Sequence, residues 1–276
     1  MTISENCVED CIFPEDEFDY ERYKHKLFGR HIQKHKNYTK TSKRVVDNKF
    51  KVYQIFTGSP KSYKRAVIDK KDSVSTKQII KENDLSCYIH SSYIINLAQS
   101  YEKIVQAVKC LQDDLTNGPK IGSKGVVVHV GKHVNKYKID EAVKNMKENI
   151  KKLVISKDCP LLIETPAGQG TELLVDITEF CGFIKDMKEI MGEDKIGICV
   201  DTCHVHASGY DPHEYLKDVE SNRLSVDLVH FNDSKTICGS KKDRHDFPGV
   251  GHIGHETLKR VHEWCLIRTI PMVLEM

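Results

Sequence analysis

Acidic and imidazole side chains recur along this 276-residue chain at points where short runs of apolar residues end. Six of them follow such runs directly: His90, His129, Glu164, Asp201, His230 and Glu275. Successive members are 29 to 45 residues apart, long enough for one strand, one crossover helix and two loops. The carboxyl ends of parallel barrel strands share one face, where the active sites of such barrels lie. The spacing therefore predicts an α/β fold, a (β/α)8 TIM barrel, with the six side chains on that face.

Three more residues of the same types, His204, Asp243 and His245, stand in the expected loops of that face. Imidazole and carboxylate groups without thiolate are typical of catalytic zinc or manganese, whereas structural zinc sites usually contain cysteine. Nine such groups exceed the needs of one ion. If carboxylates bridge, they suffice for two or three ions, an arrangement that stabilises both the attacking and the leaving oxygen of a phosphodiester.

The composition fits one globular domain inside a cell. A barrel of this kind has about 250 residues, and a domain of that size buries roughly three quarters of the surface of its unfolded chain. The ten cysteines are scattered and no secretory segment precedes them, so we expect reduced thiols and an intracellular protein. No apolar run approaches the ~20 residues of a membrane span. The net charge is only +2, so any polyanion partner must be recognised through local basic patches.

We expect two parts, an acidic leader over residues 1–23 and a barrel domain over residues 24–276. The first 21 residues contain eight acidic residues and no Lys or Arg. Within the barrel, apolar periodicity and turn residues predict the elements that carry the ligands. The first two strands are expected at 26–32 and 51–56, and helices at 41–48, from about 75, and at 140–153, 179–191 and 256–264. Apolar residues from Ile94 to Leu111 follow helical spacing and predict a further helix.

The sequence stops one residue after Glu275, so we expect no helix after the eighth strand. Parallel barrel strands normally need a covering helix on their outer face. The leader contains apolar residues such as Phe13 and Phe18, and we expect it to pack across the gap between the eighth and first strands. The alternatives are an open gap with a less stable fold, or a truncated product. Cys7 and Cys11 have no second pair at zinc-finger spacing, so no metal is expected in the leader.

The segments that carry the nine residues resemble the endonuclease IV family of apurinic/apyrimidinic (AP) endonucleases. The resemblance runs from about Leu27 to the C-terminus. The matching segments are Val127 to Gly131, Ile163 to Gly170, Val200 to His204, Ala207 to Asp211, His230 to Lys235, Gly239 to His245 and Gly251 to Gly254. Val250 departs from the family, which usually has a lysine there as a phosphate contact.

The resemblance implies three zinc ions per chain. His90, His129 and Glu164 would hold the first ion, and Glu164, Asp201, His230 and Glu275 the second. His204, Asp243 and His245 would hold the third. Glu164 is then the bridging, catalytic residue, because hydroxide held between the first two ions attacks the phosphorus 5′ to an abasic sugar. The products would be a 3′-hydroxyl and a 5′ deoxyribose phosphate, and blocked 3′ ends would also be trimmed.

The same resemblance implies a partner, double-stranded DNA with abasic sites or blocked 3′ ends, bound in base excision repair; we expect a monomer. Tyr93 and Ile94 occupy the positions of side chains wedged into the duplex, and Lys61 stands where the family usually has arginine. The other predicted contacts are Gly168, Gln169, Gly170 and Arg244. A basic segment is expected either to contact phosphates or to form a solvated helix face: Lys34, Lys36, Lys40, Lys43 and Arg44.

Two other functions stay open from the sequence. Sugar isomerases and epimerases of the xylose isomerase-like barrels also gather Glu, Asp and His at strand ends, but they usually hold fewer ions. The Asp243-Arg244-His245 segment and the basic loop argue against that function, since a small sugar needs neither a third metal site nor a basic track. A catalytically inactive DNA-damage binder is the third candidate, and the intact set of nine ligands argues against it.

Overall fold

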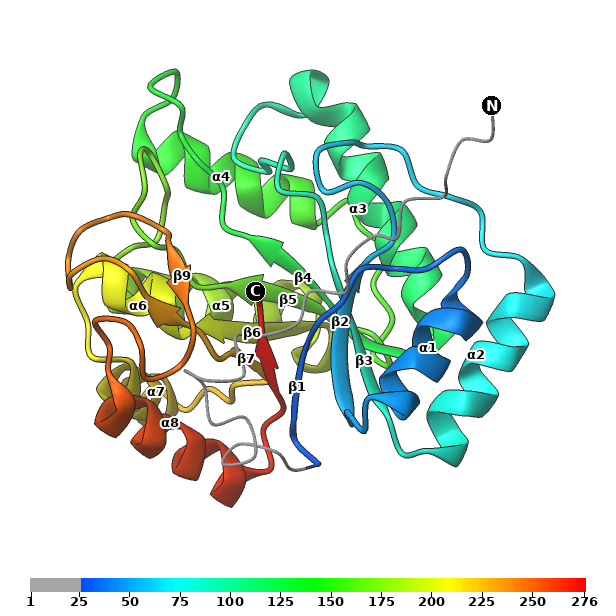
Figure 1. The fold of residues 1–276 in the computed structure, drawn as a ribbon. Coiled ribbons are helices and arrows are strands. Elements are labelled where there is room, and N and C mark those ends of the chain that lie inside the picture. The colour runs from blue at the N-terminus through cyan, green and yellow to red at the C-terminus, as the bar shows by residue number, and fades with distance from the viewer. Residues whose placement is uncertain (1–25) are drawn as a thin grey trace, which may run out of the picture.

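The computed structural model describes residues 26–276, which form a closed barrel of eight parallel strands with helices around it (Figure 1). The strand order around the barrel is β1-β10-β7-β6-β5-β4-β3-β2, so the first and last strands pair with each other. The predicted TIM barrel is therefore confirmed. The predicted leader at 1–23, its packing against the barrel, and Cys7 and Cys11 lie outside the described residues.

The barrel strands end on the side where the candidate ligands lie. They are β1 (Phe28–His31), β2 (Val52–Phe56), β3 (Ser86–His90), β4 (Ser123–His129), β5 (Leu161–Glu164), β6 (Ile196–Asp201), β7 (Leu228–His230) and β10 (Met272–Leu274). A two-stranded antiparallel ladder of β8 (Asp233–Ser234) and β9 (His245–Asp246) stands apart from the barrel. Gly29 is required where β1 approaches β2, because a Cβ atom there would lie 1.6 Å from the carbonyl oxygen of Val52.

The helices follow the strands in the order that the sequence predicts. They are α1 (Tyr38–Asp47), α2 (Lys70–Glu82), α3 (Tyr101–Ile121), α4 (Ile139–Ile150), α5 (Ile177–Met191), α6 (Thr202–Ser208), α7 (Pro212–Ser221) and α8 (His255–Arg268), with a 3-10 turn η2 (Glu193–Lys195) before β6. Within residues 26–276, none of these helices has both the length and the apolar character that a membrane crossing needs.

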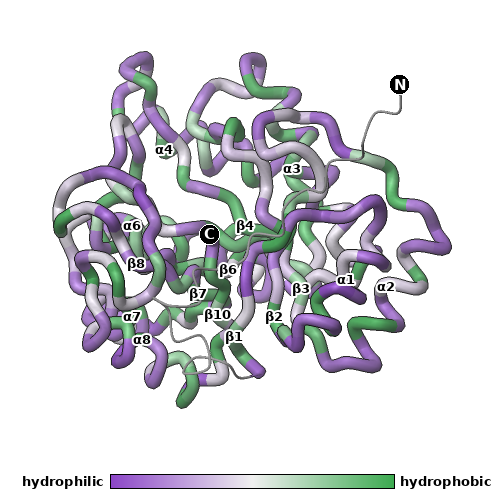
Figure 2. Tube along the Cα trace, viewed as in Figure 1, coloured by the Kyte–Doolittle hydropathy of each residue, from purple (hydrophilic) through white to green (hydrophobic). Residues whose placement is uncertain are grey.

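A layer of buried side chains fills the barrel directly beneath the strand ends. Its members are Val52, Tyr88, Val127, Leu162, Cys199, Leu228 and Val273. Six of these seven lie two residues before a predicted ligand, and side chains two apart in a strand point to the same side. The predicted ligands therefore point into the barrel above this layer. Hydrophobic residues follow the central strands and hydrophilic ones the outer turns (Figure 2).

Three predicted helix starts are wrong. Helix α1 begins at Tyr38 rather than at 41, after the capping side chain of Asn37, which accepts from the backbone N–H of Lys40. Helix α2 begins at Lys70 rather than near Ser75, because the Asp69 side chain accepts hydrogen bonds from the backbone N–H groups of Lys71 and Asp72. Helix α3 begins at Tyr101, and the stretch from Ile94 to Ala98 is a loop. The apolar spacing in that loop reflects burial of Ile95, Leu97 and Ala98 in the core and not a helical face.

Candidate active site

Five predicted ligands are the last residues of their strands, and a sixth follows directly. They are His90 on β3, His129 on β4, Glu164 on β5, Asp201 on β6, His230 on β7, and Glu275 after β10. The parallel register brings neighbours side by side: His129 pairs with Glu164, and Asp201 pairs with His230. The structure thus places these six residues where the sequence predicts them.

Glu164 lies at the centre of the site and is 1% exposed. Its Oε2 atom is 3.2 Å from His90 Nε2 and 3.0 Å from His129 Nε2. Its Oε1 atom faces the other way, 3.1 Å from His230 Nδ1 and 3.4 Å from His204 Nδ1. The two oxygens of one carboxylate therefore serve two separate groups of imidazoles, which is the geometry of a bridging ligand.

The second group forms around His230. Its Nδ1 atom lies 3.1 Å from Glu275 Oε2 and 3.7 Å from Asp201 Oδ2. One ligand atom from each of Glu164, Asp201, His230 and Glu275 lies within 4.8 Å of the others. Three carboxylates around a buried imidazole repel one another unless a proton or a cation lies between them.

The third group comes from a helix and from the β8–β9 ladder. His204 lies on α6, which begins directly after β6, and its backbone N–H donates to the capping side chain of Asp201 at 2.8 Å. Asp243 precedes β9 and His245 begins it. Asp243 Oδ2 is 3.3 Å from His204 Nε2, and Asp243 Oδ1 is 3.1 Å from His245 Nε2.

The donor atoms fit metal ions better than they fit one another. His204 Nε2 and His245 Nε2 are buried and make no hydrogen bond, since neither aligns with the Asp243 oxygen beside it. Cys203 also lies within ligand distance of Asp201 and His245, but burial raises the pKa of its thiol to about 12, so nitrogen and oxygen donors are favoured. The three groups of donors match the three sets that the family resemblance assigns.

Several side chains that hydrogen-bond to the candidate ligands are not predicted from the sequence. Asn232 Nδ2 donates to Asp201 Oδ2 at 2.7 Å, and its Oδ1 accepts from the backbone N–H of Glu275 at 2.9 Å. Thr165 Oγ1 accepts from the backbone N–H of Asp201 at 3.0 Å. Gln54 contacts two ligands from inside β2. The available signal was a polar residue inside an otherwise apolar run, as at Gln54.

Tyr93 and Ile94, the predicted wedge residues, stand exposed beside the ligands. Tyr93 is 50% exposed and Ile94 41%. The Tyr93 ring packs edge-on against His90, with 5.4 Å between ring centres, and lies 5.6 Å from the His129 ring. A side chain inserted into DNA from this position would bring the lesion next to the first ligand group.

Lys61 is exposed on the loop after β2, and this loop is bonded to the one that carries Tyr93. The Pro60 carbonyl accepts from the backbone N–H of Tyr93 at 3.0 Å and from Ser92 Oγ at 2.6 Å. Arg65, whose side chain is buried, ties the same loop to helix α3 by donating from Nε to Asp114 Oδ1 at 2.7 Å. Two loops that are distant in sequence therefore form one surface.

Gln169 reaches toward the third group. Its Oε1 atom accepts from the backbone N–H of Asp243 at 3.1 Å. Gly168 and Gly170 flank it with φ of 74° and 65°, values that favour glycine. Arg244 is exposed, and its guanidinium donates to the Asp243 carbonyl. Gln169 thus positions a candidate ligand, and the predicted DNA contacts of this segment stay predictions.

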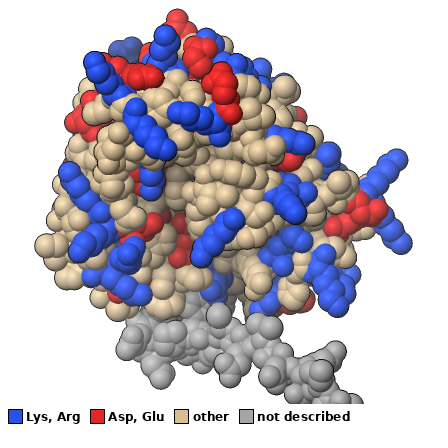
Figure 3. Space-filling model, turned by 90° about the horizontal axis from the view of Figure 1, so that it is seen from above, with Lys and Arg blue, Asp and Glu red and all other residues tan. Residues whose placement is uncertain are grey.

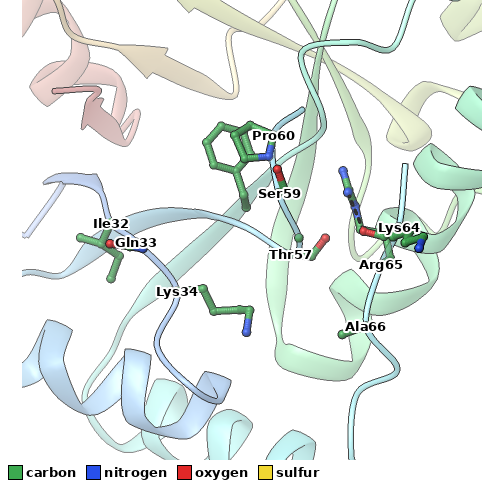
Figure 4. Close-up of a pocket in the computed structure, with 11 residues that line it drawn as sticks. Ile32, Gln33, Lys34, Thr57, Ser59, Pro60, Lys64, Arg65 and Ala66 are labelled. Atoms are coloured by element: carbon green, nitrogen blue, oxygen red, sulfur yellow. Dashed lines mark hydrogen bonds between the residues drawn. The ribbon is translucent and has the colours of Figure 1, made fainter. Parts of the chain in front are cut away.

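A hollow of about 720 Å³ lies between the loops that follow β1 and β2 (Figure 4). Lys34 lines it from one loop and Lys64 from the other. Phe56 joins the hollow to the ligand groups, because its ring centre is 5.4 Å from that of His90. Lysines at the rim of a hollow next to buried carboxylates suit a chain of phosphates.

Seen from above the barrel, acidic side chains lie in a hollowed part of the face and Lys and Arg side chains stand around it (Figure 3). Of the predicted basic segment, Lys36, Lys40, Lys43 and Arg44 are exposed and Lys34 is half-buried. Acidic groups enclosed by a basic rim fit cations held beneath a polyanion.

Residues 43–263 match the family of xylose isomerase-like TIM barrels. A probable endonuclease 4 of Staphylococcus epidermidis is 32% identical over 233 residues, which cover 81% of this chain and 77% of the relative. The chain belongs to the endonuclease IV family. This membership confirms the resemblance and the predicted class, a DNA-cleaving hydrolase.

Other endonuclease IV relatives agree in fold and sequence. An endonuclease 4 homolog of Dictyostelium discoideum is 32% identical over 270 residues, 92% of this chain. The match covers 49% of that relative, so the chain spans about half of its length. The crystal structure of endonuclease IV from Thermus thermophilus superposes with a TM-score of 0.78 and 26% identity, over 91% of this chain and 92% of the other.

Proposed function

We propose that this chain is a zinc-dependent DNA repair endonuclease that hydrolyses the phosphodiester 5′ to abasic sites. The products are a 3′-hydroxyl and a 5′ deoxyribose phosphate, and blocked 3′ ends are trimmed by the same centre. The observation that carries the proposal is the sharing of Glu164 between two donor groups, beside a third, in a barrel of the endonuclease IV family.

Each of the three donor groups has its own role in the proposed reaction. Glu164 holds the first two together, and Asp201, His230 and Glu275 complete the second. When bound, zinc supplies a lowered pKa for a water nucleophile and positive charge for the phosphate. The third group lies next to the exposed Arg244, so a phosphate at this side meets positive charge from the chain itself. Tyr93, Ile94 and Lys61 hold the duplex open at the lesion, where a missing base lowers the cost of unstacking.

We further propose that residues 24–276 act as the catalytic domain and residues 1–23 as a separate acidic leader. The enzyme acts as a monomer inside the cell, on double-stranded DNA with abasic sites or blocked 3′ ends. Gel filtration with light scattering checks the monomer, and a dimer mass rejects it.

A nicking assay tests the activity. A labelled duplex with one abasic site and the same duplex without a lesion are each incubated with zinc-loaded protein and with protein dialysed against a strong chelator. We expect cleavage 5′ to the lesion by the zinc-loaded protein alone, and extension of the product by a DNA polymerase confirms its 3′-hydroxyl. Cleavage of both duplexes alike rejects lesion specificity.

The same assay separates the other candidate functions. A DNA-damage binder without activity retards the lesion duplex but does not cut it. A sugar isomerase or epimerase neither retards nor cuts DNA and binds fewer than three metal ions. Either outcome overturns the proposal.

A further inference from the structure

Gln54 is a fully buried amide inside the barrel, and it contacts two residues of the second donor group. It is 0% exposed and lies in β2 between the buried residues Tyr53 and Ile55. Its Oε1 atom is 2.9 Å from His230 Nε2, and its Nε2 atom is 2.7 Å from Glu275 Oε1. One side chain from β2 thus joins the end of β7 to the end of β10.

Only one orientation of this amide satisfies its neighbours. The Glu275 carboxylate accepts hydrogen bonds, so the Gln54 NH2 group must face it. The amide oxygen then faces His230 Nε2, which must carry a proton and donate it. The remaining N–H of Gln54 points to His31 Nδ1 at 3.1 Å, which completes the hydrogen bonds of the amide.

The consequence for His230 is a fixed tautomer. With its proton on Nε2, the neutral imidazole presents a lone pair on Nδ1. That atom lies 3.1 Å from Glu164 Oε1 and 3.1 Å from Glu275 Oε2. A lone pair aimed at two carboxylates is stable only if a cation lies between them, so the tautomer suits metal binding.

Glu275 is oriented by the same amide. The donated bond to Oε1 leaves Oε2 free to face His230 Nδ1. The Glu275 backbone N–H is held by Asn232 Oδ1 at 2.9 Å, so both ends of this residue are fixed. Groups that hydrogen-bond to ligands in this way raise metal affinity by setting ligand orientation.

We propose that Gln54 is a positioning residue that prepares His230 and Glu275 for the second metal ion. The inference rests on the proposed function, because it requires a metal ion at that group. Gln54 touches neither DNA nor the reacting atoms; it acts through its two hydrogen bonds to ligands. A residue with this role sets how tightly the second ion is held and leaves the first and third donor groups intact.

Gln54→Met tests this role, since methionine keeps the volume and removes both hydrogen bonds. Zinc affinity is measured on the full chain by competition with a chromophoric chelator. We expect the zinc affinity of one of the three sites to fall roughly 10- to 100-fold. The matched control is Asn149→Leu, which removes a buried amide bonded to the carbonyls of Leu97 and Gln99 and to no candidate ligand. It should lower the thermal midpoint and leave zinc affinity unchanged.

Nuclear magnetic resonance gives a second readout. In the zinc-loaded protein the His230 Nε2–H proton should appear as a downfield, hydrogen-bonded resonance, assigned by its loss in His230→Asn. Gln54→Met should move it upfield or lose it to exchange with water. Gln54→Glu retains an oxygen that accepts this bond, so the resonance should persist, and this variant serves if Gln54→Met does not fold.

The outcomes separate this inference from the proposed function. Wild-type protein that binds no zinc defeats both. Wild-type protein that binds three zinc ions, with unchanged affinity in Gln54→Met, overturns the role of Gln54 alone. A His230 resonance that is lost equally in Gln54→Glu and Gln54→Met shows that the amide oxygen does not hold this proton, which also overturns it.

Discussion

The hydroxyl group of Tyr63 donates a hydrogen bond to the backbone carbonyl of Ile94, with 3.0 Å between the oxygens and 31 positions between the residues. This bond adds to the two that Pro60 accepts from the loop after β3. The loop of Lys61 and the loop of the predicted wedge are therefore held at a fixed separation before any DNA arrives. A preformed surface avoids part of the entropy cost of ordering loops on binding.

Tyr63→Phe should weaken binding to lesion DNA about 2- to 10-fold, because one exposed hydrogen bond contributes roughly 0.5–1.5 kcal/mol. Fluorescence anisotropy with a duplex that bears one abasic site measures the change. The control is Tyr210→Phe, which removes a hydroxyl that accepts from the backbone N–H of Ile177 at 3.4 Å and belongs to neither of these loops. Equal weakening in both variants would show that the bond between the loops has no special role.

Tyr93→Ala should weaken binding to lesion DNA by the ~1–3 kcal/mol typical of a lost stacking contact and barely change binding to undamaged duplex. An equal loss with both duplexes would make Tyr93 a general groove contact. At the neighbouring position, Lys61→Arg should improve affinity for the lesion, because a planar guanidinium stacks where an ammonium does not. Weaker lesion binding by Lys61→Arg contradicts that placement.

Glu164→Ala should abolish most hydrolysis and lower bound zinc below the three ions expected for wild type, since it removes the carboxylate that joins two donor groups. The fold should persist, because the apolar layer beneath the site does not include Glu164. Metal analysis and circular dichroism measure both properties. Glu148→Ala is the control, because Glu148 lies on the surface of α4 and pairs with Lys151. Nicking near the wild-type rate by Glu164→Ala would reject the shared-carboxylate centre.

Protons and zinc should compete for His245. Burial alone would lower the pKa of His245, but the negative charges of Asp201, Asp243 and Glu275 outweigh it and raise this pKa from 6.5 to about 9. In protein stripped of metal, the charged form therefore stabilises the fold fully below about pH 6.5, and this contribution is lost as the pH rises toward 9. Zinc binds neutral imidazole, so its affinity at the third group should rise over the same interval.

Urea unfolding of chelator-treated protein at about pH 6 and pH 9 measures the stability change, with His245→Gln as the comparison. The variant should show a smaller fall in unfolding free energy between the two pH values. Zinc titrations at the same pH values measure the affinity. Tighter zinc binding at pH 6 than at pH 9 would contradict the proton competition.

Asp233→Ala should destabilise the fold by about 3 kcal/mol or more, because its buried carboxylate accepts from four backbone N–H groups. The donors are Ser234, Gly249, Ile253 and Gly254, at 2.7, 2.9, 2.8 and 3.3 Å. The expected fall in thermal midpoint is roughly 6–12 °C. The control Asp69→Ala removes the exposed cap of α2 and should cost about 1 kcal/mol. Equal losses in both variants would show that the loop does not depend on Asp233.

The barrel and its ligand positions were predictable because both depend on local sequence. A ligand that ends an apolar run, as His129 does, needs only the strand period and the parallel topology to be placed. Helix boundaries depend on caps: Asp69 and Ser75 are both residue types that cap helices, and only the fold shows that Asp69 caps α2. The loop from Ile94 to Ala98 has apolar spacing like that of a helix, because burial of Ile95, Leu97 and Ala98 selects apolar side chains in any backbone conformation.

The supporting contacts were not predictable from one sequence. The Gln54 to Glu275 bond spans 221 positions, and no periodicity or spacing links two residues so far apart. Gln169 lies in a segment that resembles a family motif, yet its bond to Asp243 depends on a loop whose path the sequence does not specify. The sequence identifies which residues can be ligands, but the orientation of each ligand depends on contacts that exist only in the closed barrel.

The second donor group depends directly on the pairing of β1 with β10, the first and last strands of the barrel. The ligands of the third group all come from the stretch between His204 and His245, and the His245 ring also contacts the Glu275 carbonyl at 3.1 Å. The second group needs Glu275, which is in place only after β10 has paired with β7 and β1. Pairing between strands so distant in sequence is slow to form, so we expect the second group to be completed only when the barrel closes. A cation held by the second group would join β5, β6 and β7 to the end of β10, and it would stabilise the closed barrel relative to the open one.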